Sequence, residues 1–244
     1  MDIIREHKYI SLLVLVVVGM TALCVVQGSA IDVFWKTILH DLLVSLIAGS
    51  VTSLVLLFFL SNNENENLKE WKLVHIYSKR SEKNKDSDPK LDKARIKVDV
   101  IAFGLKSFRE TYTEKVTAAV TKGVKFRIIT MNPDSKFIAQ RDIEENKQEG
   151  ATSDSIRKLV SWANELNKTK KGSIIIKGYD CMTLDFYWRV DDDIFIGPYW
   201  LGHESRDTIT YKYEKGGTGF DVYSGYFEEL WNNEDLKILT KKQK

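Results

Sequence analysis

The sequence predicts an α/β protein in which an N-terminal transmembrane helical hairpin precedes an α/β domain with a mainly parallel mixed sheet. Two long uncharged apolar runs, at 9–26 and 42–60, predict the hairpin. From residue 96 onward, short β-branched runs alternate with segments of helical periodicity, which is the pattern of βαβ units. The 244-residue chain balances 36 Lys and Arg against 34 Asp and Glu, so it lacks the basic excess that duplex nucleic acid demands.

Each apolar run is about long enough to cross a hydrocarbon core. YISLLVLVVVGMTALCVV covers 9–26, and LLVSLIAGSVTSLVLLFFL covers 42–60. A cleaved signal peptide is the alternative for the first run, with Gly28-Ser29-Ala30 as the cleavage site, but the apolar cores of signal peptides are shorter, ~7–15 residues. Residues 1–61 are therefore predicted to form a transmembrane helical hairpin.

Basic residues flank the two runs unevenly, and this sets the predicted orientation. Two precede the first run, one lies between the runs, and six follow the second: Arg5 and Lys8, then Lys36, then Lys69, Lys72, Lys79, Arg80, Lys83 and Lys85. Because positive charge collects on the cytoplasmic side, both termini and the domain are predicted to be cytoplasmic at a bacterial inner membrane. Cys24 lies in the first run and Cys181 in the domain, so no disulfide is expected and a reducing compartment fits.

Small and polar residues recur every four positions in the second run. They are Asp41, Ser45, Gly49 and Ser53, and this spacing places them on one helix face. Small residues at such spacing let helices approach closely in lipid, so the stripe can pack against the first span or against a second copy. The alternative is a stripe that lines a pore in an oligomer, with His40 and Asp41 at its outer mouth.

Residues 62–95 are predicted to be a juxtamembrane segment and linker. SKRSEKNKDSDPK, Ser78 to Lys90, is polar and rich in lysine, which is typical of a mobile linker or loop. A basic patch that attracts anionic lipid is the alternative interpretation.

Residues 96–244 are predicted to form the cytoplasmic domain. Ser107 lies three residues before Glu110, the spacing of a capping box, and Gly123 ends the helix that follows. The other expected elements are strands at 97–103, 124–131, 173–177 and 208–213, helices at 134–148, 153–168 and 224–231, and a hairpin around 191–193.

Asp191-Asp192-Asp193 lies between two apolar, aromatic runs. Aspartate tolerates turn geometry and keeps a hairpin tip solvated, which favours a turn. A metal site is the alternative, but no histidine or glutamate lies at ligand spacing beside the three aspartates. No metal or cofactor is therefore expected.

One part of the chain resembles a known family. KGVKFRIITMNPDS, 122–135, followed by two helices, a strand and a hairpin that ends in Ile196-Gly197, is similar to one half-repeat of the phospholipase D-like fold over 96–231. Active members carry H-x-K-x4-D-x6-G-S/T, in which the histidine attacks phosphorus and the lysine holds the phosphate. Aligned on Gly197, this chain has Thr183 at the histidine position, Asp185 at the lysine position, Asp191 near the aspartate, and Pro198 and Trp200 at the last two. The resemblance therefore implies a domain without phosphodiesterase activity.

The C-terminal part fits a subset of that resemblance. HESRDTITYKYEKGGTGFDVYSGYFEELW, 203–231, is similar to the end of degenerate phospholipase D-like sensor modules of bacterial regulators. Six residues carry the match: Arg206, Thr208, Tyr226, Phe227, Leu230 and Trp231. The resemblance implies a binding module rather than an enzyme.

Candidate ligand-binding residues cluster where predicted strands end. They are Asn132, Ser135, Arg141, Tyr179, Thr183, Asp185 and Arg206. Backbone N–H groups at the helix start near 132–135 can face an anion, and aromatic residues of 179–231 can stack on bases. The structural alternatives are a helix cap at 132–135, a surface ion pair for Arg141 and a core position for Tyr179. The glycines of 216–219 indicate a loop and only weakly a phosphate site.

The leading functional hypothesis is a bacterial anti-phage membrane effector. Its catalytically inactive domain senses a nucleotide or a single-stranded oligonucleotide and controls an oligomeric membrane pore. The expected partners are the lipid bilayer, further copies of the chain, the nucleotide ligand and a cognate nucleotide-producing enzyme. The alternatives are a membrane-tethered phosphodiesterase or nuclease, and a scaffold that binds a partner protein.

Overall fold

The computed structural model describes residues 2–28, 32–103, 105–168, 173–181 and 185–241. The chain divides into two compact units, Met1–Asn67 and Leu68–Lys244. The first unit holds helix α1 (Asp2–Gly28) and most of helix α2 (Val33–Trp71), whose last turn belongs to the second unit.

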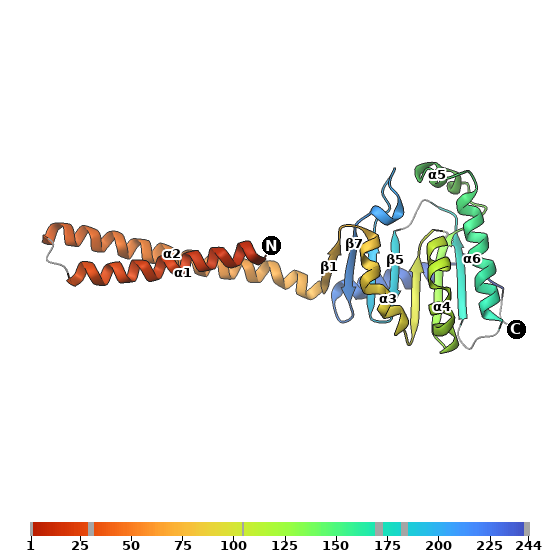
Figure 1. Ribbon diagram of the computed structural model, residues 1–244, viewed down its shortest axis with the longest axis horizontal. Coiled ribbons are helices and arrows are strands. Elements are labelled where there is room, and N and C mark those ends of the chain that lie inside the picture. Colours follow the sequence, from red (N-terminus) through yellow and green to blue (C-terminus); the bar gives the residue numbers. More distant parts are fainter. Residues whose placement is uncertain (1, 29–31, 104, 169–172, 182–184, 242–244) are drawn as a thin grey trace. The chain divides into compact units, whose positions relative to one another are not determined.

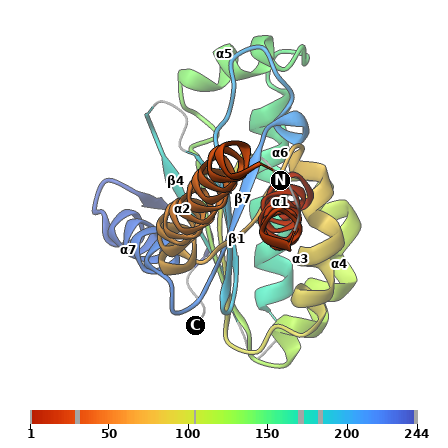
Figure 2. The same cartoon turned by 90° about the vertical axis from the view of Figure 1, so that its left-hand side faces the viewer.

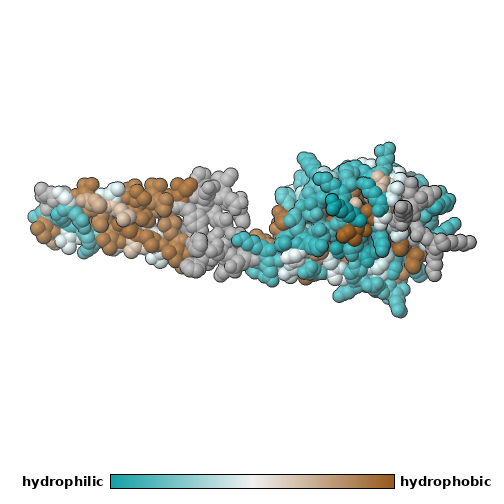
Figure 3. Space-filling model, turned by 90° about the horizontal axis from the view of Figure 1, so that it is seen from below, coloured by the Kyte–Doolittle hydropathy of each residue, from teal (hydrophilic) through white to brown (hydrophobic). Residues whose placement is uncertain are grey.

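Both helices of the first unit are long and apolar enough to cross a membrane. The apolar segments are Ile10–Gly28 and Val33–Leu56, and only 6% of each is buried within the protein. Figure 3 shows apolar side chains over much of the coloured surface of this unit, whereas the visible surface of the second unit is mainly hydrophilic. Helices that are apolar on all sides and lack a protein interior to cover them are suited to a lipid environment.

The two helices pack together through a face of α2 that is not the predicted stripe. A Cβ atom added to the buried Gly19 of α1 would lie 2.9 Å from Cγ1 of Ile47, and Ser50 of α2 is buried as well. The stripe residues are all exposed in this hairpin: Asp41, Ser45, Gly49 and Ser53. In this hairpin the stripe therefore does not face the first span, and its predicted roles in helix packing or in a pore stay predictions.

The second unit is built on one mixed sheet in the order β1-β7-β6-β5-β2-β3-β4-β8 (Figure 1). Its strands are β1 (Leu73–Tyr77), β2 (Lys97–Ile101), β3 (Lys125–Met131), β4 (Ser173–Tyr179), β5 (Phe186–Val190), β6 (Asp193–Gly197), β7 (Thr210–Glu214) and β8 (Lys237–Ile238). The α/β class and the mixed sheet are confirmed. The mainly parallel arrangement is wrong, because only the β2–β3 and β3–β4 pairs of the described strands are parallel.

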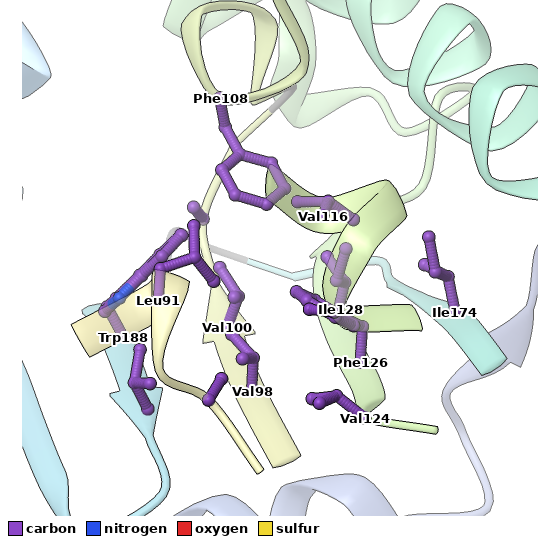
Figure 4. Close-up of a cluster of buried hydrophobic side chains, with 14 of the residues drawn as sticks. Leu91, Val98, Val100, Phe108, Val116, Val124, Phe126, Ile128, Ile174 and Trp188 are labelled. Atoms are coloured by element: carbon purple, nitrogen blue, oxygen red, sulfur yellow. The ribbon is translucent and has the colours of Figure 1, made fainter. Parts of the chain in front are cut away.

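Helices cover both faces of this sheet. The face shared by α3 (Asn84–Asp92), α4 (Lys106–Thr121) and α6 (Ala151–Asn167) lies opposite the face covered by α7 (Thr218–Asn232), as Figure 2 shows. Alternate strand residues enter the two cores, so Val100 packs toward α4 in the cluster of Figure 4 while Ile101 packs on the α7 side. Burial on both faces explains why these strands are largely apolar, with Asp99 of β2 and Arg127 of β3 as charged exceptions that pair with each other.

The linker predicted for Ser78 to Lys90 is instead folded. A short 3-10 helix η1 (Arg80–Lys83) leads directly into α3. Leu91 at the end of α3 is 1% exposed, and the polar side chains of Arg80, Lys83 and Ser87 are buried too. Composition misleads here because the segment buries charged and polar groups rather than apolar ones.

Asp191 and Asp192 form the turn of the β5–β6 hairpin, as predicted, and Asp193 begins β6. Asp191 has a φ of 45°, and its carboxylate accepts hydrogen bonds from the backbone N–H groups of Arg95, Ile96 and Lys97 at 2.7, 2.9 and 2.9 Å. Asp193 accepts a hydrogen bond from Lys90 Nζ at 2.9 Å. Asp191 therefore holds the segment at the start of β2 against the hairpin, and Asp193 holds α3 against it.

Two helix starts differ from the predictions. Leu105, with a φ of 48°, is the N-cap of α4, so the expected capping box at Ser107 is wrong and no side chain caps the helix. Helix α7 begins at Thr218 rather than near 224, so Gly219 is helical. Gly217 lies so close to the end of α2 that a Cβ atom there would come within 2.5 Å of Lys72 Cβ.

Candidate ligand-binding site

A pocket of about 650 Å³ opens where β2 ends and α4 begins. Its wall is formed by α3, by the first turns of α4, by β5 and by the segment that contains the short helix η2 (Ser205–Asp207). Five basic and three acidic side chains line it: Arg80, Lys83, Lys106, Lys147 and Arg206, with Asp88, Glu145 and Glu204. The carboxyl ends of parallel strands are where α/β folds usually bind ligands.

Arg80 supplies a buried cation at this pocket. Its side chain is 6% exposed, and its Nη2 donates to the carbonyl of Pro198 at 2.9 Å and to Oγ1 of Thr208 at 2.6 Å. The guanidinium lies 4.2 Å from the ring centroid of Phe186 and 4.5 Å from that of Tyr199. No carboxylate of the described residues lies within ion-pair distance of it, and burial lowers its pKa.

Lys83 supplies a second buried cation, which is also 6% exposed. Its Nζ lies 3.2 Å from both Asn84 Oδ1 and Ser87 Oγ and 4.9 Å from the ring centroid of Trp188. Among the described side chains it too has no carboxylate within ion-pair distance. Burial lowers the pKa of Lys83 to about 8, an effect that Asp88 partly opposes and Arg80 reinforces.

Two buried cations without a carboxylate partner are unfavourable unless something else compensates them. Burial of a charge removes its hydration, and the aromatic rings of the wall return only part of that free energy. Arg80 and Lys83 both lie over the ring of Phe186, so their charges also repel each other. An anion in the pocket would compensate both charges, so this arrangement is a candidate anion-binding site.

The N-terminus of α4 adds to this electrostatic field. Lys106 and Ser107 begin this 16-residue helix and line the pocket, and no side chain caps the helix. Uncapped N–H groups and the positive end of the helix dipole attract anions. Together with the two buried cations, they define where an anionic group would lie.

Arg141, a predicted ligand residue, contacts two residues that line the pocket, Glu145 and Ser205. It is buried, its Nη1 donates to Glu144 at 3.1 Å, and its Nη2 bonds to Glu145 and, at 3.1 Å, to Ser205. Burial raises the pKa of Glu145, but hydrogen bonds from Lys147 and Ser205 and the charge of Arg141 hold it below its ordinary value. Arg141 therefore forms ion pairs with Glu144 and Glu145. This agrees with the predicted ion pair, except that Arg141 is buried and not on the surface.

Three further predicted residues lie in local structure between β3, β4 and α5 (Phe137–Glu144). Asn132 Oδ1 accepts the N–H of Asp134 at 3.2 Å, and Ser135 Oγ donates to Asp180 at 2.5 Å. Tyr179 is buried in the core on the α7 side. None of Asn132, Ser135 and Tyr179 lines the pocket.

The remaining predicted residues are Thr183, Asp185 and Arg206. Thr183 lies outside the described residues. The pKa of Asp185 is raised by desolvation and lowered in part by the charge of Arg80, which places this carboxyl near the pocket although it does not line it. Arg206 is exposed at the rim, where its Nε lies 2.7 Å from Glu204.

Sequence reasoning missed the two cations that define the site. Arg80 and Lys83 stand in a polar segment, between β1 and Leu91, whose composition is typical of a linker. Nothing in the local pattern distinguishes these two cations from the exposed Lys79 and Lys85 beside them.

Comparisons with known proteins leave the family open. No family model matches the chain, and no curated protein matches it. Among solved structures it is similar to TrmBL2, an archaeal chromatin protein with a novel mode of DNA binding, at a TM-score of 0.43 and 15% identity over 82% of this chain and 69% of that one. It is also similar to NucT from Helicobacter pylori, at a TM-score of 0.40 and 9% identity over 64% of this chain and 92% of that one. Likenesses this distant assign neither a family nor an activity, so the phospholipase D-like resemblance stays a prediction.

Proposed function

We propose that this chain is a bacterial membrane effector controlled by a small ligand. The hairpin spans the inner membrane, and both termini and the domain lie in the cytoplasm. The pocket binds a nucleotide or a short oligonucleotide without cleaving it. Its occupancy sets the arrangement of hairpins in an oligomer that permeabilises the membrane, as a response to phage infection.

The pair of buried cations, Arg80 and Lys83, is the observation that carries this proposal. A nucleotide combines an anionic phosphate with a planar ring, and the pocket pairs those cations with the aromatic side chains of Phe108, Phe186 and Trp188. Its volume of about 650 Å³ is in the range that small ligands occupy in proteins, ~300–1,000 Å³. The pocket thus suits a mononucleotide or a short oligonucleotide better than a long strand.

The chain path supports coupling between pocket and membrane. Helix α2 ends at Trp71 and is followed by β1 (Leu73–Tyr77). The next element, η1, begins with Arg80 and ends with Lys83. The two cations that would bind the phosphate therefore lie in the first helix after β1, and β1 directly follows α2. A ligand can shift the assembly only if it binds its two arrangements with different affinity.

The direct test is the identity of what the protein carries. The full-length chain is extracted in detergent and denatured, and released small molecules are identified by mass spectrometry. A phosphate-bearing compound with an aromatic ring is expected. If none is released, and no member of a panel of mono-, cyclic and short oligonucleotides binds the protein, the proposed function fails.

Binding is expected to take up a proton near pH 8. A phosphate beside Lys83 favours the ammonium form, so the pKa of Lys83 should rise from about 8 in the complex. Affinity should then fall as pH rises through 8. Lys83 is about half protonated at pH 8 before binding, so in calorimetric titrations at this pH the measured enthalpy should differ between HEPES and Tris buffers by about half the difference in their ionisation enthalpies. Buffer-independent enthalpies would show that Lys83 does not titrate on binding.

Gly49→Leu is expected to abolish depolarisation of cells that express the protein with its ligand. A Cβ atom at Gly49 meets nothing within 4 Å, so the larger side chain leaves the hairpin intact and obstructs only contacts with other copies. Membrane potential is measured with a voltage-sensitive dye. Val55→Leu, at another exposed position of α2, is the matched control and should leave depolarisation unchanged. Equal depolarisation by Gly49→Leu and the unmodified protein would contradict a role for the stripe.

A further inference from the structure

Asp88 adds a carboxylate to a pocket that is lined by more basic than acidic side chains. It lies on α3 and lines the pocket beside Lys83, Ser87 and Tyr112. The Tyr112 hydroxyl donates to Oδ1 at 2.8 Å and to Oδ2 at 2.9 Å. Burial and this bond raise the pKa of Tyr112, so its hydroxyl stays a donor and holds the carboxylate in a fixed orientation.

A carboxylate at this point disfavours a ligand that is only an anion. Ser87 Oγ lies 3.2 Å from Lys83 Nζ and 3.4 Å from Asp88 Oδ1, so the carboxylate and the cation are separated by one hydroxyl. A phosphate bound at Lys83 would be repelled by Asp88. A carboxylate has about four acceptor positions, and Tyr112 and Ser87 use only part of them. The remaining ones suit N–H donors of the ligand.

Aromatic side chains surround this end of the pocket. The ring centroids of Phe108 and Trp188 are 5.1 Å apart, and those of Phe108 and Tyr112 are 5.7 Å apart (Figure 4 shows Phe108 and Trp188). All three line the pocket with Asp88. These rings pack against one another, so a planar ring in the pocket would lie against their pocket-facing surface and turn its edge toward the carboxylate.

We propose that Asp88 recognises the N–H edge of a guanine base, an inference that rests on the nucleotide ligand proposed above. Guanine presents two adjacent donors, N1–H and N2–H, which match the two oxygens of a carboxylate. Adenine presents a ring nitrogen acceptor beside its amino group, and that acceptor would face Asp88 unfavourably. Uracil offers a single N–H between two carbonyl oxygens. The pocket therefore takes guanine nucleotides, with the phosphate at Arg80, Lys83 and the start of α4.

The test is calorimetric titration of the full-length protein in detergent with guanosine and adenosine 5′-monophosphates. Guanosine monophosphate should bind at least about tenfold more tightly, the discrimination that a paired hydrogen bond provides. In Asp88→Asn, one acceptor becomes a donor, so the affinity for the guanine nucleotide should fall about tenfold while that for the adenine nucleotide stays the same or rises. Asp92→Asn, at an exposed position of the same helix, should behave as the unmodified protein does.

Each result separates this inference from the proposal on which it rests. Equal affinity for the two nucleotides in the unmodified protein, or an unchanged preference in Asp88→Asn, overturns the role of Asp88 and leaves the proposed function intact. Failure of both nucleotides, and of the wider panel, removes the proposed function and this inference with it. Retained binding of the adenine nucleotide by Asp88→Asn demonstrates that the variant is folded.

Discussion

Replacing Lys83 by methionine is expected to weaken nucleotide binding by about tenfold to a hundredfold and, at the same time, to stabilise the protein. The loss of affinity follows from removal of a charge-assisted hydrogen bond, ~1.5–3 kcal/mol. The gain in stability follows because Lys83 is a buried ammonium beside aromatic rings and without a carboxylate partner. Methionine has similar length, fills the same space and carries no charge, so the free energy of unfolding should rise by about 1–3 kcal/mol.

The pH dependence of this stabilisation has a definite sign. Burial lowers the pKa of Lys83 in the folded protein to about 8, below the ordinary value of 10.5 that applies to the unfolded chain. Below pH 8 the lysine is charged in both states, and the folded state bears the full cost of burying it. Between about pH 8 and 10.5 the unfolded state binds more protons, so stability of the unmodified protein rises with pH. The advantage of Lys83→Met should therefore be largest below pH 8 and shrink above it.

Thermal unfolding and calorimetric titration of the detergent-solubilised chain measure the two effects separately. Lys85→Met is the matched control, because Lys85 lies in the first turn of α3, just after Lys83, and has an exposed side chain. It should change neither affinity nor stability. A Lys83→Met protein that binds the nucleotide as tightly as the unmodified protein would contradict the role of Lys83 in the site. One that unfolds at a lower temperature would contradict the uncompensated-charge argument.

The elements that could be predicted are those whose burial follows a simple period. Strands β2, β3 and β4 and helices α4 and α6 lie within a few residues of the predicted ranges, because apolar residues at fixed spacing mark their buried faces. The turn at Asp191 was also predictable, since its chemistry is local. The strand directions were not. Whether β5 pairs antiparallel with β2, and β7 with β6, depends on how the chain returns to the sheet over distances that local patterns do not encode.

The site was less predictable than the fold for a related reason. Arg141 and Arg206 do come near the pocket, because residues after strand ends tend to converge at one edge of the sheet. The defining pair, Arg80 and Lys83, comes from a segment without any apolar periodicity. Its burial is decided by Phe186 and Trp188, which are more than a hundred residues away in the chain. A polar sequence that folds onto a pocket cannot be distinguished from a linker by composition.

Gly219→Ala is expected to destabilise the protein by about 2–3 kcal/mol, the upper part of the range for overpacking a close contact. A Cβ atom at Gly219 would lie 2.2 Å from Tyr213 Cδ1 and 2.9 Å from the carbonyl oxygen of Trp71. Tyr213 is buried, and its ring packs between Trp71 and Tyr223, so it cannot move aside. The added methyl group must therefore displace either the β7 side chain or the backbone at the end of α2.

The same helix provides a control of opposite sign. Gly225 is exposed within α7, and a Cβ atom there meets nothing within 4 Å. Alanine is favoured over glycine in a helix interior by about 0.5–1 kcal/mol, so Gly225→Ala should raise the unfolding temperature where Gly219→Ala lowers it. Neither glycine lines the pocket, so both variants should keep their nucleotide affinity at temperatures where they are folded. An unfolding temperature of Gly219→Ala equal to that of Gly225→Ala would mean that the end of α2 is not held against β7 and α7 as closely as these contacts require.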